Sequence, residues 1–186
     1  MTTARLQSPT GPPPESGTNS LPSWREPALV GLGALGVYLV TLARFSCWGD
    51  SSELTLVGLT GAIAHPTGYP LYSLLSMGVA PLGSSVGASP TVVQGLLSAV
   101  PMALASAGIT RLAGQLGALP VAAVGAGAGF ALLREPWEQA VVPEVYGMHV
   151  AWLTVILLAA LRFDQRPSAR NLAWMALVVG LGLSHH

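Results

Sequence analysis

The sequence has little charge, because only 9% of its 186 residues are Asp, Glu, Lys or Arg. A soluble domain normally carries roughly 25% charged residues, which cover its surface. Here 51% of the residues are hydrophobic and the mean hydropathy is +0.57. We therefore expect lipid to cover much of the surface. The composition predicts an all-α, multi-pass integral membrane protein, and we expect a bacterial inner membrane.

Other absences exclude further classes of protein. The one cysteine, Cys47, cannot form an intramolecular disulfide. Eight basic and eight acidic residues leave no net charge, which argues against nucleic acid as a partner. The sequence contains no Walker-type phosphate loop, no GxSxG elbow and no CxxC pair, so ATPase, hydrolase and thioredoxin-type functions have no support.

The composition divides the chain into a tail and a membrane domain. Residues 1–23 are rich in Pro, Gly, Ser and Thr and are expected to be disordered. Residues 24–186 are expected to form one transmembrane domain, a polytopic helical bundle with about five to six membrane segments. A spanning helix needs about 20 mostly apolar residues. The candidate apolar runs are 27–45, 71–82, 91–112, 119–133, 147–161 and 172–183.

A shorter apolar run, 54–64, lies in the first loop and is too short to span comfortably. We interpret it as a helix in the membrane interface. Ser51 or Ser52 can cap its start. His65-Pro66 is expected to end it, because the residue before a proline is disfavoured in the helical region.

The orientation of the spans depends on residues 71–82. Arg5 and Arg25 precede the first span and favour a cytoplasmic amino terminus, which places residues 48–72 on the outer face. If residues 71–82 do not fully cross the membrane, the basic connector 162–170 lies on the cytoplasmic side and most of the polar candidate residues share the outer face. This arrangement obeys the positive-inside rule, and we prefer it. An extra crossing between 83 and 112 would also satisfy the rule.

The stretch Trp48–Tyr72 contains the strongest candidates for chemistry. Asp50 and Glu53 are three residues apart, so on a helix they share a face, and a carboxylate near a helix start is stabilised by the helix dipole. A partly desolvated carboxylate can act as a general base toward an attacking hydroxyl. A capped, solvated helix start is the alternative.

His65, Tyr69 and Tyr72 follow in the segment HPTGYPLY. Its two prolines restrict the backbone and are expected to expose an imidazole and two phenols at the membrane surface. These groups can hydrogen-bond a phosphate or a sugar. The alternative is a rigid turn whose histidine has no chemical role.

Further polar candidates lie later in the chain. Glu138 and Glu144 stand near Tyr146, where an interfacial belt of polar and aromatic residues is the ordinary expectation. His185 and His186 are adjacent, and two histidines without further ligands are a weak metal signal. No metal site and no cofactor are therefore assigned, and a divalent metal has no support from the sequence.

Four motifs occur in order: WGDSSEL, AHPTGYPLY, WEQAVVPEVYGMH and GLGLSHH. In order and spacing, Trp48 to His186 resembles the family of multi-spanning proteins related to vertebrate transmembrane protein 260, a protein O-mannosyltransferase. The sequence departs from the family pattern at Ser52, where glycine is usual, and at Thr67, where proline is usual. Either change can alter the stiffness of its loop, but neither removes a candidate catalytic group.

The resemblance implies a glycosyltransferase of the GT-C class that transfers a hexose, expected to be mannose, from a polyprenyl-phosphate donor to a protein hydroxyl at the outer membrane face. It implies that Asp50 is the base or orients the acceptor and that Glu53 assists it. His65 and Tyr69 would lie near the lipid phosphate or sugar. The same resemblance suggests secondary site roles for Glu144, Tyr146, His185 and His186.

Members of that family have further spans, so the chain is expected to be the amino-terminal portion of a longer enzyme. Two other functions stay open. One is a proton- or ion-coupled transporter component, in which Asp50, Glu53 and the histidines form a relay. The other is a non-catalytic remnant.

Overall fold

The computed structural model describes residues 23–45 and 49–184, and this part of the chain contains eight helices and no strand. The prediction of an all-α protein is confirmed. The expected disordered tail lies almost wholly outside the described residues, and Cys47 lies outside them too. The helices are α1 (Arg25–Thr41), α2 (Asp50–Thr60), α3 (Pro70–Ser85), α4 (Pro90–Gln115), α5 (Pro120–Leu132), α6 (Arg134–Ala140), α7 (Tyr146–Gln165) and α8 (Ala169–Leu183).

Proline and glycine set several of these boundaries. Pro70, Pro90 and Pro120 each occupy the first turn of a helix, where the missing N–H has no partner to lose. Helix α2 ends at Gly61, whose φ of 69° is left-handed and whose N–H donates to the Val57 carbonyl at 3.0 Å. The expectation that His65-Pro66 ends this helix is therefore wrong, because the glycine terminates it earlier.

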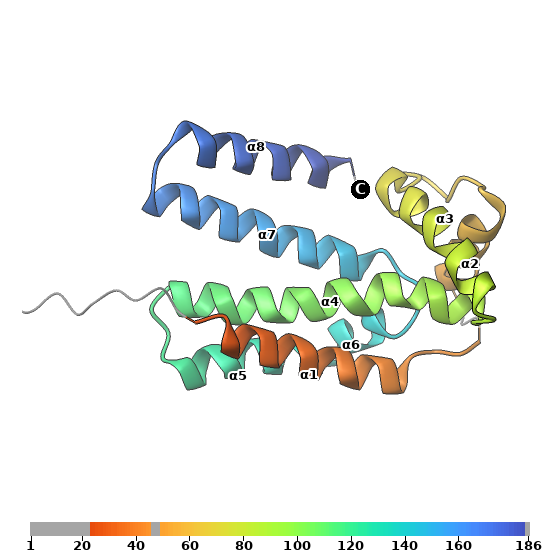
Figure 1. Ribbon diagram of the computed structural model, residues 1–186, viewed down its shortest axis with the longest axis horizontal. Coiled ribbons are helices and arrows are strands. Elements are labelled where there is room, and N and C mark those ends of the chain that lie inside the picture. The colour runs from red at the N-terminus through yellow and green to blue at the C-terminus, as the bar shows by residue number, and fades with distance from the viewer. Residues whose placement is uncertain (1–22, 46–48, 185–186) are drawn as a thin grey trace, which may run out of the picture.

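Helix α4 forms the centre of the bundle, with α1 and α5 on one side and α7 on the other, while α8 packs outside α7 (Figure 1). Its buried face includes Ala99, Ala103 and Met102, which pack against Tyr38 of α1. Small residues let helix backbones approach closely. The Tyr38 hydroxyl donates to the Ala131 carbonyl at 2.9 Å, which ties α1 to α5.

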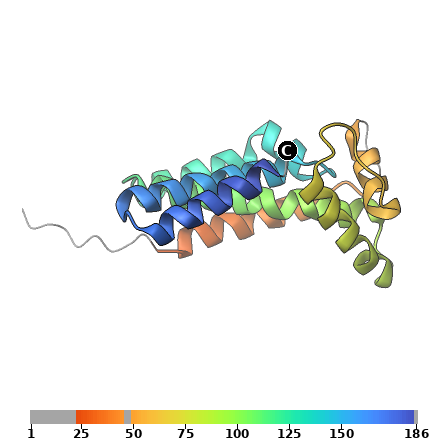
Figure 2. The same cartoon turned by 90° about the horizontal axis from the view of Figure 1, so that it is seen from above.

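Helices α2 and α3 do not run along the bundle but lie together at one end of it (Figures 1 and 2). We call this the site end, which also contains the loop 141–145. Four helix ends meet at the opposite end of the bundle, namely the start of α1, the end of α4, the end of α7 and the start of α8. We call this the basic end, because Arg111, Arg162 and Arg166 line a pocket there. The run 71–82 lies within α3 and thus belongs to the site end.

Two helices are long and apolar enough to cross a membrane, namely α4 and α7. Helix α1 has 17 residues, α8 has 15 and α5 has 13. At 1.5 Å per residue, α5 rises only about 20 Å, less than the roughly 30 Å of a hydrocarbon core. Helix lengths therefore support a helical membrane-type fold, and the count of five to six spans stays a prediction.

Candidate active site at the end of the bundle

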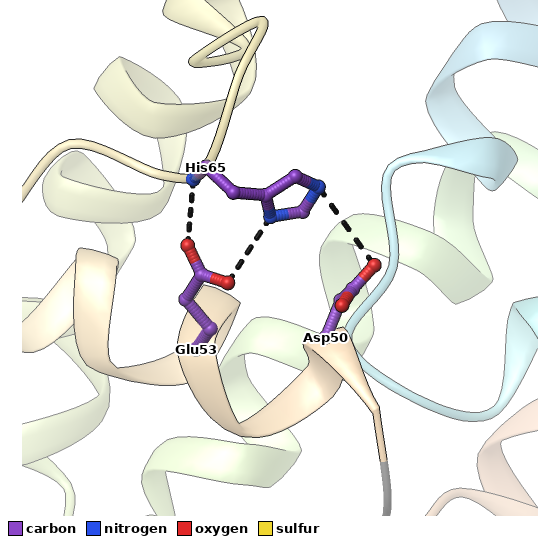
Figure 3. Close-up of side chains that lie close together, drawn as sticks. All are labelled: Asp50, Glu53 and His65. Atoms are coloured by element: carbon purple, nitrogen blue, oxygen red, sulfur yellow. Dashed lines mark hydrogen bonds and ion pairs between the residues drawn. The ribbon is translucent and has the colours of Figure 1, made fainter.

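Three predicted residues meet at the start of α2 (Figure 3). The backbone N–H of His65 donates to Glu53 Oε1 at 2.6 Å, and His65 Nδ1 lies 3.1 Å from Glu53 Oε2. Asp50 Oδ2 lies 3.8 Å from the other ring nitrogen, Nε2. One histidine thus stands between two carboxylates, and we call Asp50, Glu53 and His65 the acid–histidine cluster.

Glu53 orients the imidazole. It receives two bonds from His65, one from the backbone and one from the ring, so the loop after α2 is fixed to the first turn of α2. The backbone hydrogen bond from His65, followed by that from the ring, lowers the pKa of the Glu53 carboxyl. In the tautomer that carries its proton on Nδ1, the imidazole donates to Glu53 and its Nε2 faces Asp50.

Asp50 remains open to a substrate. Its side chain is 58% exposed, and a separation of 3.8 Å from Nε2 is too long for a direct hydrogen bond. A hydroxyl placed beside both atoms can contact Asp50 and His65 together. The arrangement therefore offers one incoming hydroxyl group a carboxylate that can accept its proton and an imidazole as a second polar contact.

Tyr69 contacts the same imidazole at Nε2, the nitrogen that faces Asp50. Its hydroxyl lies 3.4 Å from His65 Nε2, and the two rings meet edge to face with centroids 5.4 Å apart. Tyr69 has a φ of 42°, a left-handed conformation that costs energy for a residue with a Cβ. Such strain is common at functional sites, where it aims a side chain. Here it accompanies the approach of the phenol to the histidine.

Glu144 joins the site from the loop between α6 and α7. Ser51 Oγ of α2 lies 3.4 Å from Glu144 Oε1. Ser98 of α4 holds the backbone of Glu144, because its hydroxyl donates to the Glu144 carbonyl and accepts from the Glu144 N–H, both at 2.8 Å. The expectation that Ser51 or Ser52 caps α2 is wrong, because Gly49 occupies the cap position, both serines lie inside the helix, and no side-chain cap hydrogen bond forms.

Replacing Ser98 with alanine should destabilise the site end. The change removes both bonds to the Glu144 backbone and leaves its N–H and carbonyl without that partner, which costs about 1–3 kcal/mol. Thermal unfolding should show a lower midpoint for Ser98→Ala. Thr110→Val is the matched control, because that buried hydroxyl of α4 bonds back to the Ser106 carbonyl within its own helix. Equal losses in both variants would contradict a special role for Ser98.

The carboxyl of Glu144 should make stability depend on pH. Burial, and then the charge of Asp50, raises its pKa above the ordinary value. The folded state therefore holds this proton more tightly than the unfolded state, and the resulting stability is lost as pH rises through the folded pKa. We expect Glu144→Gln to match the wild type in unfolding midpoint near pH 4 and to exceed it near pH 7. A difference that is the same at both pH values would contradict this assignment.

Other predicted residues lie apart from the cluster. Glu138 is exposed and pairs with Arg134 at 2.8 Å, one helical turn away on α6. Tyr146 is 52% exposed and lines a separate cavity with Glu135 and Gln139. His185 and His186 lie outside the described residues.

The expectation that both phenols of HPTGYPLY are exposed is wrong for Tyr72. Its side chain is fully buried among Leu54, Val57 and Met148, and its hydroxyl has no hydrogen-bond partner among the described residues. The helical turn that starts at Pro70 turns this position toward α2 and α4. Tyr72 therefore packs beneath the site.

The acid–histidine cluster has the ligand types of a metal site. One imidazole and two carboxylates offer ligand atoms that all lie within 4.8 Å of one another. Zinc and other divalent transition metals accept this donor set. Each of the three residues was predicted from the sequence, but a metal site was not, because the loop 61–69 is what brings His65 back over α2.

An apolar groove runs between α3 and α4, beside the site. Its cavity volume is about 520 Å³, and its lining includes Leu75, Val79, Leu96 and Val100. Met148 lines the groove and also packs in the buried cluster with Tyr72. The groove therefore lies directly next to the residues that support the acid–histidine cluster.

Sequence reasoning missed Ser51 as a partner of Glu144 and missed Ser98 altogether. Ser98 lies in the middle of an apolar run, where a lone hydroxyl most often bonds to its own helix. A buried Ser76 and Gln94 pair, which joins α3 to α4 at 2.7 Å, was missed for the same reason. The available signal was weak: polar side chains within apolar helices are often interhelical contacts.

The sequence that forms this site matches a known protein family. Residues 50–186 match the family described as the protein O-mannosyl-transferase TMEM260 N-terminal domain. The protein O-mannosyl-transferase TMEM260 of mouse is 29% identical over an alignment of 164 residues, and the alignment covers 83% of this chain and 22% of the mouse protein. The chain thus spans about a fifth of the length of this relative. No solved structure shows significant similarity. Because the matched region contains the whole acid–histidine cluster and most of the chain, the chain belongs to the TMEM260 N-terminal domain family.

Proposed function

We propose that this chain is the amino-terminal part of a membrane glycosyltransferase that transfers a hexose, expected to be mannose, from a polyprenyl-phosphate donor to a hydroxyl of a protein. The observation that carries the proposal is the acid–histidine cluster, which lies inside the family match and presents an exposed Asp50 beside an oriented imidazole. The mouse relative is a protein O-mannosyl-transferase by name.

The distribution of charge supports an extracytoplasmic site within a transmembrane domain formed by residues 24–186. Arg111 and Arg162 line a pocket at the basic end, whereas Asp50 and Glu53 lie at the site end. The positive-inside rule places the basic end in the cytoplasm and the site end on the opposite face. In this arrangement α1, α4, α5, α7 and α8 are the five membrane segments, and α5, which is shorter than a hydrocarbon core, is followed directly by α6 toward the site end. Helix α2 lies in the interface, and α3 does not cross.

The apolar groove between α3 and α4 supports a lipid-linked donor. A polyprenyl chain needs an apolar surface that extends from the membrane to the reacting phosphate. The groove has this character and shares Met148 with the packing beneath the cluster. In our proposal the isoprenoid chain lies in the groove, and the phosphate and sugar lie toward His65 and Tyr69.

The proposed reaction is a substitution at the anomeric carbon of the sugar. The acceptor hydroxyl lies beside both Asp50 Oδ2 and His65 Nε2 and gives its proton to Asp50 as its oxygen attacks. The new bond joins the acceptor oxygen to the anomeric carbon, and the bond from that carbon to the phosphate oxygen breaks. Polyprenyl phosphate leaves with the bonding electrons. Glu53 keeps the imidazole oriented throughout.

A transfer assay tests the proposal directly. Membranes that contain the complete product of the gene encoding this chain are incubated with polyprenyl-phosphate mannose carrying a radioactive sugar and with a peptide rich in Ser and Thr. We expect label on the peptide, and a β-elimination step should release it as an O-linked sugar. Absence of transfer together with proton-coupled solute uptake in vesicles would instead support a transporter.

A further inference from the structure

A second polar pocket lies at the basic end, far from the acid–histidine cluster. It has a cavity volume of about 330 Å³ and is formed by α1, α4, α7 and α8. Three arginines line it: Arg111 of α4, Arg162 in the last turn of α7, and Arg166 directly after α7. The other lining side chains are neutral, so no carboxylate lines this pocket within the described part of the chain. We call it the arginine pocket.

The pocket changes character along α7. Val155, Leu158 and Ala159 line its inner part, and Arg162, Gln165 and Arg166 line its outer part. The residues from Val155 to Gln165 follow a helical spacing and therefore share one face of α7, and Arg166 follows directly as the C-cap. The rise from Val155 to Gln165 is about 15 Å. The pocket is thus apolar toward the middle of the bundle and positively charged at its end.

Two tryptophans flank the arginines. Trp24 lies over Arg111, with the guanidinium carbon 4.5 Å from a ring centroid, and Trp174 contributes from α8. Trp24 is 66% exposed and Trp174 is 51% exposed. Trp24 is the N-cap of α1 and Trp174 lies in the second turn of α8, and exposed tryptophans near helix ends are typical of the membrane–water interface. Their position places the arginines at the level of lipid headgroups.

Arg111 fixes the inner wall of the pocket. Its side chain is only 5% exposed, and its Nη1 donates to the Ser23 carbonyl at 3.4 Å. Arg162 and Arg166 are exposed at the mouth and can approach a ligand from α7. All basic residues of the sequence are arginines. The planar guanidinium group suits phosphate, because it can donate two parallel hydrogen bonds to it.

We infer that the arginine pocket binds the phosphate of an anionic phospholipid at the membrane face opposite the acid–histidine cluster. The headgroup phosphate contacts Arg162 and Arg166, and the acyl chains follow the apolar face of α7 toward Val155. Basic pockets between membrane helices are known to hold anionic headgroups. The apolar inner part favours a lipid over a free phosphate, because a soluble anion would leave that surface without a contact.

Native mass spectrometry of the complete gene product in mild detergent tests the inference, with phosphatidylglycerol and phosphatidylcholine of equal chain length as probes. We expect preferential binding of phosphatidylglycerol. The double variant Arg162→Gln/Arg166→Gln should weaken that binding about 30-fold, given the usual contribution of an arginine near an anionic lipid surface. Arg25→Gln/Arg170→Gln removes the same charge from exposed positions that do not line the pocket, and it should change the affinity less than threefold.

Competition with inorganic phosphate and glycerol phosphate separates the possible sources of the phosphate. Little displacement of phosphatidylglycerol supports a lipid site, whereas efficient displacement by either soluble anion would show that the pocket takes a soluble phosphate and would overturn the lipid assignment. Equal weakening of phosphatidylglycerol binding in both double variants, or equal binding of the two lipids, would overturn the inference that the arginine pocket binds an anionic phospholipid. Thermal unfolding checks that each variant is folded.

Discussion

Asp50→Asn should lower mannosyl transfer by about 10²–10⁴-fold in the complete protein, because a general base in this kind of step contributes about that factor. Asparagine keeps the size of the side chain but cannot take up the proton of the acceptor. We expect the loss in kcat, with little change in KM for the lipid donor. The measurement is initial transfer rate against donor concentration at saturating acceptor peptide.

Asp164→Asn provides a matched control for this variant. It makes the same chemical change at an exposed aspartate on α7, near the basic end. We expect unchanged transfer. Asp50 is largely exposed, and its carboxylate approaches His65 no closer than 3.8 Å. Its replacement should therefore leave the unfolding midpoint nearly unchanged. Normal turnover of a folded Asp50→Asn enzyme would remove Asp50 from the mechanism.

Gly147→Ala should destabilise the protein by about 1–3 kcal/mol, the usual cost of forcing extra atoms into a packed interior. Gly147 begins α7 against α4, and a Cβ there would lie 2.4 Å from the Ser98 carbonyl oxygen and 3.1 Å from the Ser98 Cα. These atoms are backbone and cannot turn aside. Helix α7 must then move away from α4 and carry Glu144 with it. We expect a lower unfolding midpoint and reduced transfer.

Gly180→Ala is the corresponding control. Gly180 lies in α8, and a Cβ built there has nothing within 4 Å. Alanine also favours the helix over glycine by up to about 1 kcal/mol. This variant should be neutral or slightly more stable. If Gly147→Ala retained the wild-type midpoint and activity, the close approach of α7 to α4 would not be a requirement of the site.

Much of the candidate site was predictable because it lies within one short stretch. Asp50 and Glu53 share a helical turn, and His65 follows after the loop. Even so, the sequence alone left two possibilities open for these carboxylates: a solvated helix start, or a general base with an assisting carboxylate. The contacts of His65 with both acids came from the return of the loop, and its path depends on the left-handed Gly61 and Gly68 and on Tyr69.

The sequence by itself determined that this is an all-α protein of mostly apolar helices. It also determined the approximate starts of several helices and the residues that carry the family motifs. These features depend on local hydrogen bonding, proline and glycine geometry, and composition. Only the tertiary structure decided that α3 lies with α2 at the site end, that Tyr72 is buried, and that Ser98 holds Glu144. It also gathered Arg111, Arg162 and Arg166 into one pocket. The physical reason is that these helices are apolar on nearly every side, so their sequence periodicity does not mark which face meets a neighbour. Close packing of small residues and a few interhelical hydrogen bonds make that choice.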